Sequence, residues 1–364
     1  MERLSTHQFM VLGSAVLLGT TFFPAGSLVA GIAGRDGWMA ILPGFIIGIP
    51  FGLMILSMVP KYPNKNLLEI SERVLGKWLG KGLGILYFAV VTYFGAVLSV
   101  QGVDMFIRTI LPLMPRYVFI FGGITIILLL FFTGIEVLAR FAEVVFPIIM
   151  ASLILTAIFA IPRFEQGELY PILSEGIKPI FYASFQIAPW PMEYILILAG
   201  LISFLPKQSR DLRQMKKALW RSVFLVVFLN TITVIIQILT FGPFEAARLT
   251  YGLLALGKMI EVSRTVSGVE SVFALVWMGA LIIKVGAFFF AGMWGIKTVF
   301  GLNNKKWSFA LAGVYISIGL LFTRGAIIAV EIGAVDNYFV LPFTVFWVPL
   351  IWGVDKWKSR PKNR

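Results

Sequence analysis

The chain is dominated by apolar segments that are long enough to cross a membrane. A helix needs about 20 apolar residues to span the hydrocarbon core, and ten segments of roughly this length follow one another: 9–33, 38–59, 83–111, 117–134, 141–161, 180–204, 219–241, 271–299, 307–322 and 338–352. Apolar residues make up 59% of the 364 residues and charged residues only 13%, which excludes an ordinary soluble domain. We therefore expect an all-α integral membrane protein with ten transmembrane helices in one membrane domain, 1–364.

The first apolar segment is interrupted near its middle. It reads Leu18-Gly19-Thr20-Thr21-Phe22-Phe23-Pro24 at the depth where the hydrocarbon should be thickest. Glycine and proline weaken the helix, and a broken helix survives in lipid only where it lines a cavity or a site. A break at the bilayer centre therefore predicts a binding site for a small solute.

The sixth segment has a matching interruption, which reads Gln186-Ile187-Ala188-Pro189-Trp190-Pro191-Met192-Glu193. Broken helices at the first position of two five-helix halves are typical of transporters with inverted repeats. We therefore predict a 5+5 inverted repeat, with 9–161 as the first repeat and 180–352 as the second. The alternative is that these prolines are ordinary kinks, which membrane helices tolerate.

The net charge of +13 is explained by membrane topology. If the N-terminus is cytoplasmic, most of the 31 lysines and arginines fall on the inner side of the ten segments, as the positive-inside rule requires. Both termini are thus expected in the cytoplasm, and no nucleic-acid partner is needed. The lipid bilayer itself is the expected environment.

Two connecting segments have apolar residues at helical spacing. The segment 60–82 carries such a stripe on the inner side, and 244–260 carries one on the outer side. Both are interpreted as amphipathic helices in the membrane interface. Each is either a packed surface helix or a gate over a site.

Several short motifs occur in an order and spacing that resemble one family. They are Asp36-Gly37-Trp38, Tyr62-Pro63, Leu75-Gly76-Lys77-Trp78-Leu79-Gly80, Tyr170-Pro171-Ile172-Leu173-Ser174-Glu175-Gly176, Met192-Glu193, Glu270-Ser271 and Val276-Trp277. The chain closely resembles the membrane-embedded B subunit of spore germinant receptors (the GerAB type). That family is a branch of the amino acid–polyamine–organocation (APC) transporters.

The resemblance implies a LeuT/APC-like fold, with helices one and six unwound around a ligand. It also implies a nutrient receptor of the cell membrane, located in the inner membrane of dormant spores, that works with A and C subunits. The chain departs from the family at Gly19-Thr20-Thr21, where members tend to have Gly-small-Gly, so ligand size is expected to differ. Gly268 replaces an arginine that many members carry, which leaves an Arg–Glu pair with Glu270 in doubt.

The two breaks supply the candidate ligand contacts. Exposed N–H groups attract a carboxylate and unwound carbonyls accept from an ammonium, so the predicted ligand residues are Leu18, Gly19, Thr20, Thr21, Gln186, Ile187 and Ala188. Tyr93 faces the cavity in this interpretation. Glu193 either recognises an ammonium or couples protons, or else bonds a neighbouring helix. Trp190 is either an aromatic lid or a packing residue.

Lys284 lies near the centre of the eighth segment. We predict that its ammonium replaces a coupling sodium ion and donates to carbonyls near Gly19 or to Thr20. The alternatives are an ion pair with Glu193 or a side chain that snorkels to the surface. Glu270, near the outer mouth of the same segment, is a gate candidate.

The leading functional hypothesis is a germinant receptor B subunit that binds an amino acid or similar small nutrient and signals germination. The alternative is a proton-coupled secondary amino acid transporter. An enzyme is not expected, because the sequence shows no nucleophile–base pair. The chain has no cysteine and one histidine, so neither a metal site nor a cofactor is expected.

Overall fold

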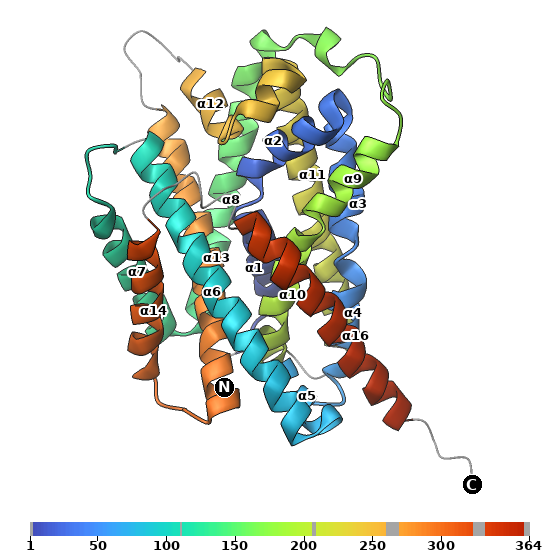
Figure 1. The fold of residues 1–364 in the computed structure, drawn as a ribbon, viewed down its shortest axis with the longest axis vertical. Helices are drawn as coiled ribbons and strands as arrows, with labels where there is room; N and C mark the ends of the chain where they lie inside the picture. Colours follow the sequence, from blue (N-terminus) through green and yellow to red (C-terminus); the bar gives the residue numbers. More distant parts are fainter. Residues whose placement is uncertain (1–2, 110, 206–208, 260–268, 323–331, 360–364) are drawn as a thin grey trace.

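The computed structural model describes the whole chain except residues 1–2, 110, 206–208, 260–268, 323–331 and 360–364 (Figure 1). The described residues form helices and connecting segments, which confirms the all-α class for this part of the chain. The α-helices are α1 (Thr6–Leu18), α2 (Phe22–Ala33), α3 (Ile41–Ile46), α4 (Ile49–Met58), α5 (Leu67–Leu75), α6 (Lys77–Thr109), α7 (Arg116–Thr133), α8 (Ile135–Ala160), α9 (Lys178–Ile187), α10 (Pro189–Leu201), α11 (Ser209–Arg248), α12 (Gly252–Met259), α13 (Val269–Phe300), α14 (Trp307–Leu321) and α16 (Leu341–Lys358). The shorter elements are the 3₁₀-helices η1 (Gly34–Ala40), η2 (Ile161–Arg163), η3 (Gln166–Leu169) and η4 (Ile202–Phe204), and the π-helix η5 (Asp336–Val340).

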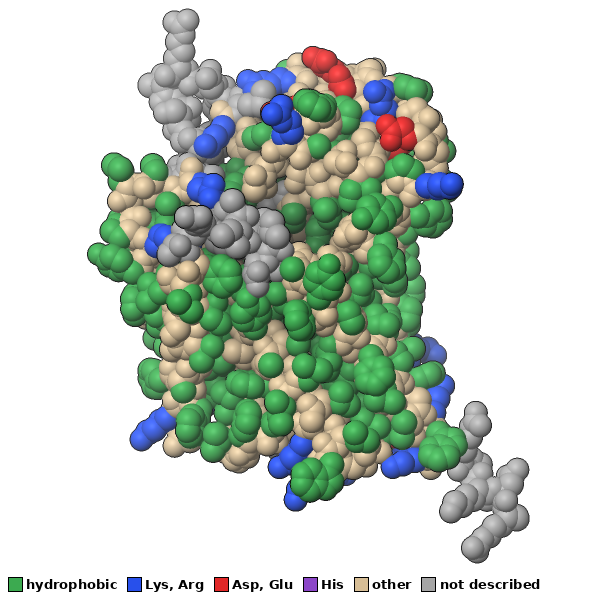
Figure 2. Space-filling model, viewed as in Figure 1, with side chains coloured by type: hydrophobic (Ala, Val, Ile, Leu, Met, Phe, Trp, Pro, Cys, Tyr) green, Lys and Arg blue, Asp and Glu red, His purple; other side chains and the backbone are tan. Residues whose placement is uncertain are grey.

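On the face drawn in Figure 2, apolar side chains cover the middle of the molecule, with lysine and arginine side chains above and below them. In the described residues, eight helical stretches are long and apolar enough to cross a membrane, and α1 and α14 are apolar but shorter. One of the eight, Pro24–Met58, has 35 residues, which is more than a single crossing requires. It combines the second half of the first predicted span with the second predicted span. The chain is therefore a multi-pass membrane protein, and the count of ten spans stays a prediction.

The first described residues and the end of α16 lie toward the same end of the molecule, the lower end in Figure 1. Contacts agree with this placement: the Leu4 N–H donates to the Phe204 carbonyl at 3.2 Å, and Lys61 is paired with Asp355 of α16. A shared side for both termini fits the predicted topology. The assignment of that side to the cytoplasm stays a prediction.

Helices occur in both segments where amphipathic helices are predicted, with different lengths, and their place in the membrane interface stays a prediction. α5 begins with a capping box, in which the Asn66 side chain accepts from the Glu69 N–H and Glu69 accepts from the Asn66 N–H. Its apolar stripe is buried, as at Ile70 and Val74. The outer segment 244–260 is divided between the end of α11, which kinks at Gly242 (φ 71°), and the short helix α12. In the described residues, α5 is thus a packed surface helix.

α1 lies in the interior of the bundle, where it packs against α8, α11 and α13. α6 packs along α13 (Figure 1). The most enclosed helix is α10, in which every residue is buried. α7 lies at the opposite extreme: only Ile120, Ile124, Ile127 and Phe131 are buried, so it presents one face to the protein and the others to lipid.

Candidate functional site

The first break separates α1 from α2 as a turn over residues 19–21. The turn is tight, because Gly19 and Thr21 keep right-handed helical dihedral angles. The Thr21 N–H donates to the Leu18 carbonyl at 3.3 Å, three residues earlier, instead of the usual four. The break therefore lies where the sequence predicts it, but the chain there is a tight turn and not the unwound stretch that the resemblance implied.

The second break separates α9 from α10 at Ala188. Ala188 has φ −56° and ψ −29°, which are again helical values, and its N–H donates to the Phe185 carbonyl at 3.3 Å. This break is one residue wide. The two predicted breaks thus share one local structure, a turn with hydrogen bonds three residues apart.

Prolines leave a carbonyl without its usual donor at both breaks. In an α-helix each carbonyl accepts from the N–H four residues later, and proline has no N–H. Pro24 cannot bond the carbonyl of Thr20, and Pro191 cannot bond the carbonyl of Ile187. Both carbonyls need another donor in a buried setting, which is the property that a ligand-binding break requires.

Gly19 brings the first break into close contact with α13. A methyl group at Gly19 would lie 3.0 Å from the Ala280 carbonyl oxygen and 3.2 Å from Cβ of Lys284. Any larger side chain would have to push the two helices apart. The glycine in the sequence is thus explained by packing, and it places Lys284 beside the turn.

The Lys284 ammonium is one of the most deeply buried charges in the described part of the chain, with a side chain 1% exposed. Its Nζ donates to the Thr20 hydroxyl and lies 2.5 Å from Oε2 of Glu193. The sequence predicted donation to Thr20, with pairing to Glu193 as an alternative, and the structure contains both contacts. Lys284 therefore joins the break in α1 to the helix that follows the second break.

Asp336 completes this group and was missed by the sequence reasoning. It is the first residue of η5, it is 2% exposed, and its carboxyl group is in hydrogen-bonding contact with that of Glu193. The last predicted span starts at 338, so Asp336 lies just before it. No signal in the sequence pointed to Asp336, because one lysine and one glutamate inside apolar segments already balance each other in charge.

Other predicted ligand residues lie on a different surface of the second break. The side chain of Ile187 packs against Gly44 in α3, and Trp190 contacts Phe45 edge to face with ring centroids 6.1 Å apart. Gln186 is half-buried. Trp190 therefore has the packing contact that was weighed against a lid.

The remaining candidates, Tyr93 and Glu270, lie in α6 and α13. Tyr93 is half-buried in α6, where it packs against Val97 and Val100. Glu270 falls at the start of α13, and its side chain lies outside the described residues. The structure thus brings together Thr20, Glu193 and Lys284 from the predicted set.

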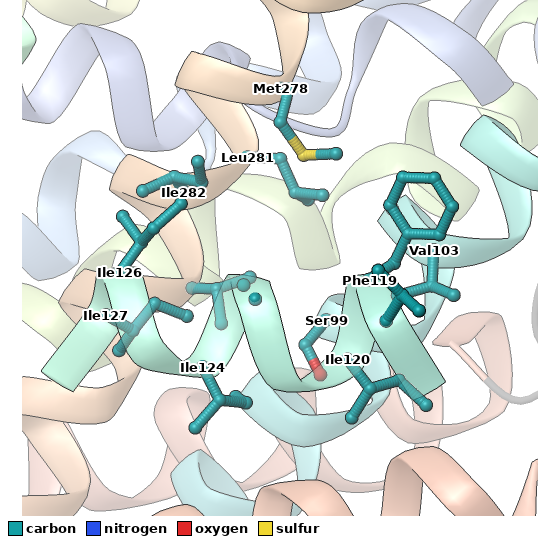
Figure 3. Close-up of a pocket in the computed structure, with 15 residues that line it drawn as sticks. Ser99, Val103, Phe119, Ile120, Ile124, Ile126, Ile127, Met278, Leu281 and Ile282 are labelled. Carbon is teal, nitrogen blue, oxygen red and sulfur yellow. The ribbon is translucent and has the colours of Figure 1, made fainter. Parts of the chain in front are cut away.

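Two cavities occur near these helices. One of about 230 Å³ lies between α6, α7 and α13 and is lined by apolar side chains (Figure 3). The lining of this cavity includes the Ser99 side chain, which carries a hydroxyl group, and contains no charged group. The cavity therefore suits a hydrocarbon chain better than the charged ends of an amino acid. The other, of about 1230 Å³, lies at the lower end, with Glu69, Arg73 and Lys297 in its lining.

Comparison with protein families gives a match over most of the chain. Residues 3–324 match the profile of a family described as "Spore germination protein". The chain belongs to this family. The resemblance that the motifs indicate is therefore confirmed.

Individual members of the spore germination family are distant but extensive matches. Spore germination protein KB of Bacillus subtilis (strain 168) is 25% identical over 374 residues, covering 100% of this chain and 97% of the relative. Spore germination protein YndE of the same organism is 25% identical over 283 residues, covering 77% of this chain and 76% of the relative. Spore germination protein B2 is 24% identical over 315 residues, with 84% and 83% covered.

Solved structures show that this member of the family has a transporter fold. MhsT in complex with L-phenylalanine superposes with a TM-score of 0.71 at 16% identity, covering 97% of this chain and 90% of that chain. A manganese transporter of Eremococcus coleocola has a TM-score of 0.63 at 12% identity, covering 97% and 78%. At these identities the likeness concerns the fold alone, which is of the LeuT type that the resemblance implied.

Proposed function

We propose that this chain is the B subunit of a spore nutrient germinant receptor. In this role it binds an amino acid or a similar small nutrient at the two helix breaks. The observation that carries the proposal is the Lys284–Thr20 contact, which places a buried ammonium at the turn between α1 and α2. Membership of the spore germination family selects germination as the response, and the transporter fold supplies a central site.

The breaks offer complementary groups for the two ends of an amino acid. The N-terminus of α2 has N–H groups that attract a carboxylate. The carbonyls of Thr20 and Ile187 lack their usual donors and accept from an ammonium. The proposed contacts are therefore those predicted from the sequence at both turns, with Thr20 and Thr21 supplying hydroxyl groups.

Lys284 takes the place of a coupling cation in this proposal. Its ammonium is held by Thr20 on one helix and Glu193 on another, as a bound sodium ion would be held by oxygen ligands. Ligand binding is then independent of sodium. A thermal-shift screen of the purified protein against the common amino acids, run with and without sodium chloride, tests this. A shift that requires sodium contradicts the role of Lys284.

The signal is passed to other subunits of the receptor in the inner spore membrane. Relatives named as spore germination proteins B2 and KB support a place in such an assembly. The partners proposed from the resemblance are the A and C subunits. Co-purification of this chain with those subunits from spore membranes checks the assembly.

The central experiment removes the two hydroxyl groups at the first break. Spores that carry Thr20→Val together with Thr21→Val should lose their response to the nutrient while the receptor still assembles. The matched control is Thr125→Val together with Thr133→Val on α7, where both hydroxyls bond carbonyls of their own helix. An undiminished response in the first variant contradicts the proposed site.

The second candidate is a proton-coupled amino acid transporter, which the buried carboxyl groups of Glu193 and Asp336 favour. Both candidates use one site and differ in net flux. Proteoliposomes that contain the purified chain and labelled amino acids separate them. Binding without uptake supports the receptor, and uptake driven by a pH gradient supports the transporter.

A further inference from the structure

Three charged side chains from three different helices meet in the interior of the described structure. Lys284 of α13, Glu193 of α10 and Asp336 of η5 are each 1–2% exposed. The group contains one basic and two acidic residues. If all three were ionised, it would carry a net charge of −1 in surroundings of low dielectric constant, which is costly.

The contacts within this group indicate how that charge is neutralised. Lys284 Nζ lies 2.5 Å from Oε2 of Glu193, while the carboxyl groups of Glu193 and Asp336 are in hydrogen-bonding contact with each other. An ionised carboxylate can only accept hydrogen bonds. Two carboxyl groups can therefore share a hydrogen bond only if one of them carries a proton.

A second observation concerns the remaining oxygen of Asp336. Its Oδ1 is buried and has no hydrogen-bond partner among the described residues. A fully ionised carboxylate in such a place would leave lone pairs of a charged group without a hydrogen bond. This costs more free energy than leaving a neutral group without one. Asp336 also opens a π-helix, and such segments often occur at functional sites.

No further charged group compensates this cluster within the described structure. Glu193 interacts with Lys284 and with the carboxyl group of Asp336, and Asp336 interacts with Glu193 and Lys284. α3 and α4 contain no charged residue. Other charges on the helices packed against α10 lie elsewhere: His7 of α1 pairs with Glu143, and Asp355 of α16 pairs with Lys61. At the end of α16, Lys356 lies over Trp352 and Lys358 donates to the Val74 carbonyl. Lys178 starts α9, and the lower cavity is lined by Glu69, Glu72, Arg73 and Lys297. The nearby tyrosine hydroxyls are those of Tyr194, which faces Gly13, and Tyr87, which donates to the Leu196 carbonyl.

We propose that Glu193 and Asp336 form a proton-binding site that holds one proton between their carboxyl groups. With this proton bound, the cluster is neutral and Lys284 is shared by Glu193 and Thr20. Release of the proton to water adds a second negative charge, which competes with Thr20 for the Lys284 ammonium. The charge state of the pair is thereby linked to the turn at the first break.

The link to nutrient binding rests on the proposed function, whereas the proton site does not. Linkage between two binding sites is reciprocal. If the proton changes the affinity for a ligand that engages Thr20 by some factor, that ligand changes the proton affinity of the Glu193–Asp336 pair by the same factor. The proton is therefore tested without any ligand. A failed proton test leaves the nutrient experiment standing, and the reverse also holds.

The test is infrared spectroscopy of the purified full-length chain in detergent near neutral pH. A protonated carboxylic acid has a C=O stretching band that shifts in D₂O. Because either acid alone would be balanced by Lys284, Asp336→Asn and Glu193→Gln should each lose this band. Asp355→Asn, which alters the ion pair with Lys61, is the control and should keep it.

Thermal unfolding as a function of pH gives a second readout. The folded wild type holds one proton more than the unfolded chain, whose carboxyl groups are ionised at neutral pH. Stability therefore falls as pH rises, by about tenfold in the folding equilibrium constant per pH unit. Asp336→Asn mimics the protonated acid in shape and should remove this slope. A wild type without the band, or a band and slope that persist in both variants, would overturn the proposal.

Discussion

Two lysine–carboxylate clusters in this molecule are built from similar groups and differ in their access to water. In the interior, Lys284 contacts Glu193 and the Thr20 hydroxyl, and the two charged side chains are 1% and 3% exposed. At the lower end, Lys61 contacts Asp355 and the Ser359 hydroxyl, and the charged side chains are 43% and 11% exposed. The same chemistry should therefore have very different consequences for stability.

The comparison separates two roles for an ion pair. Water can solvate either partner of the Lys61 cluster when the other is removed, so each charge is replaceable there. In the interior no water takes over, and every charge depends on its partner. A buried pair of this kind costs stability to maintain, which points to a functional reason for keeping it.

The largest effect is expected from Lys284→Met. This variant removes the cation beside two buried acids and should lower the free energy of unfolding by about 3–5 kcal/mol. Thermal unfolding in detergent measures it. The triple variant Lys284→Met with Glu193→Gln and Asp336→Asn leaves no ionisable group in the cluster and should recover most of the loss. No recovery would show that the cost arises from packing.

Thr20→Val sharpens the comparison at the hydroxyl groups. Lys284 loses a buried acceptor, and a hydrogen bond to a charged group is worth about 2 kcal/mol. The corresponding change at the lower end is Tyr62→Phe, which removes a hydroxyl 2.5 Å from Asp355 that water can replace. Its effect on the unfolding temperature should be much smaller. Equal shifts in the two variants would contradict the proposed difference in water access.

Gly19→Ala tests whether the interior cluster depends on close packing of α1 and α13. The added methyl group would lie 3.0 Å from the Ala280 carbonyl oxygen, and we expect a loss of about 1–2 kcal/mol. Gly122→Ala on α7 is the matched control, because nothing lies within 4 Å of its added methyl group. That variant should be neutral or slightly more stable, since alanine favours the helix. A neutral Gly19→Ala would show that the helices can separate freely.

Lys61→Met should have the smallest effect, less than about 1 kcal/mol. The hydrogen bond with Asp355 raises the pKa of Lys61 above its ordinary value of 10.5. A raised pKa means that the pair contributes stability at neutral pH and that this contribution is lost as pH rises through the folded-state value. The unfolding temperatures of wild type and variant should thus converge above pH 10.5. A difference that persists there would contradict an electrostatic origin.

The positions of the helix breaks were predictable because glycine and proline act locally. Pro24 and Pro191 remove specific backbone donors wherever they stand, so the breaks fall at the predicted residues. The shape of the breaks was not predictable from the sequence, because the chain closes each one with a three-residue hydrogen bond. That choice depends on packing by the neighbouring helices.

The interior cluster was predicted in part. A lysine inside an apolar segment must find oxygen atoms, and Thr20 and Glu193 were the candidates within apolar segments. Asp336 escaped because η5 extends the last span by a π-helix, which no periodic pattern announces. The contact of 2.7 Å between His7 and Glu143 was likewise not predictable. That contact joins parts of the chain too far apart for spacing to show.

The complete burial of α10 has a consequence for the rate at which its residues are substituted during evolution. Along α7, exchanges among leucine, isoleucine and phenylalanine on the outward side meet fluid lipid, which adapts to any shape. Along α10, the same exchanges meet fixed neighbours on every side, so each change of volume is felt. Both helices are strongly apolar, yet α10 should diverge slowly and α7 quickly. The rate of substitution would thus distinguish a helix that the protein encloses from one that the membrane encloses.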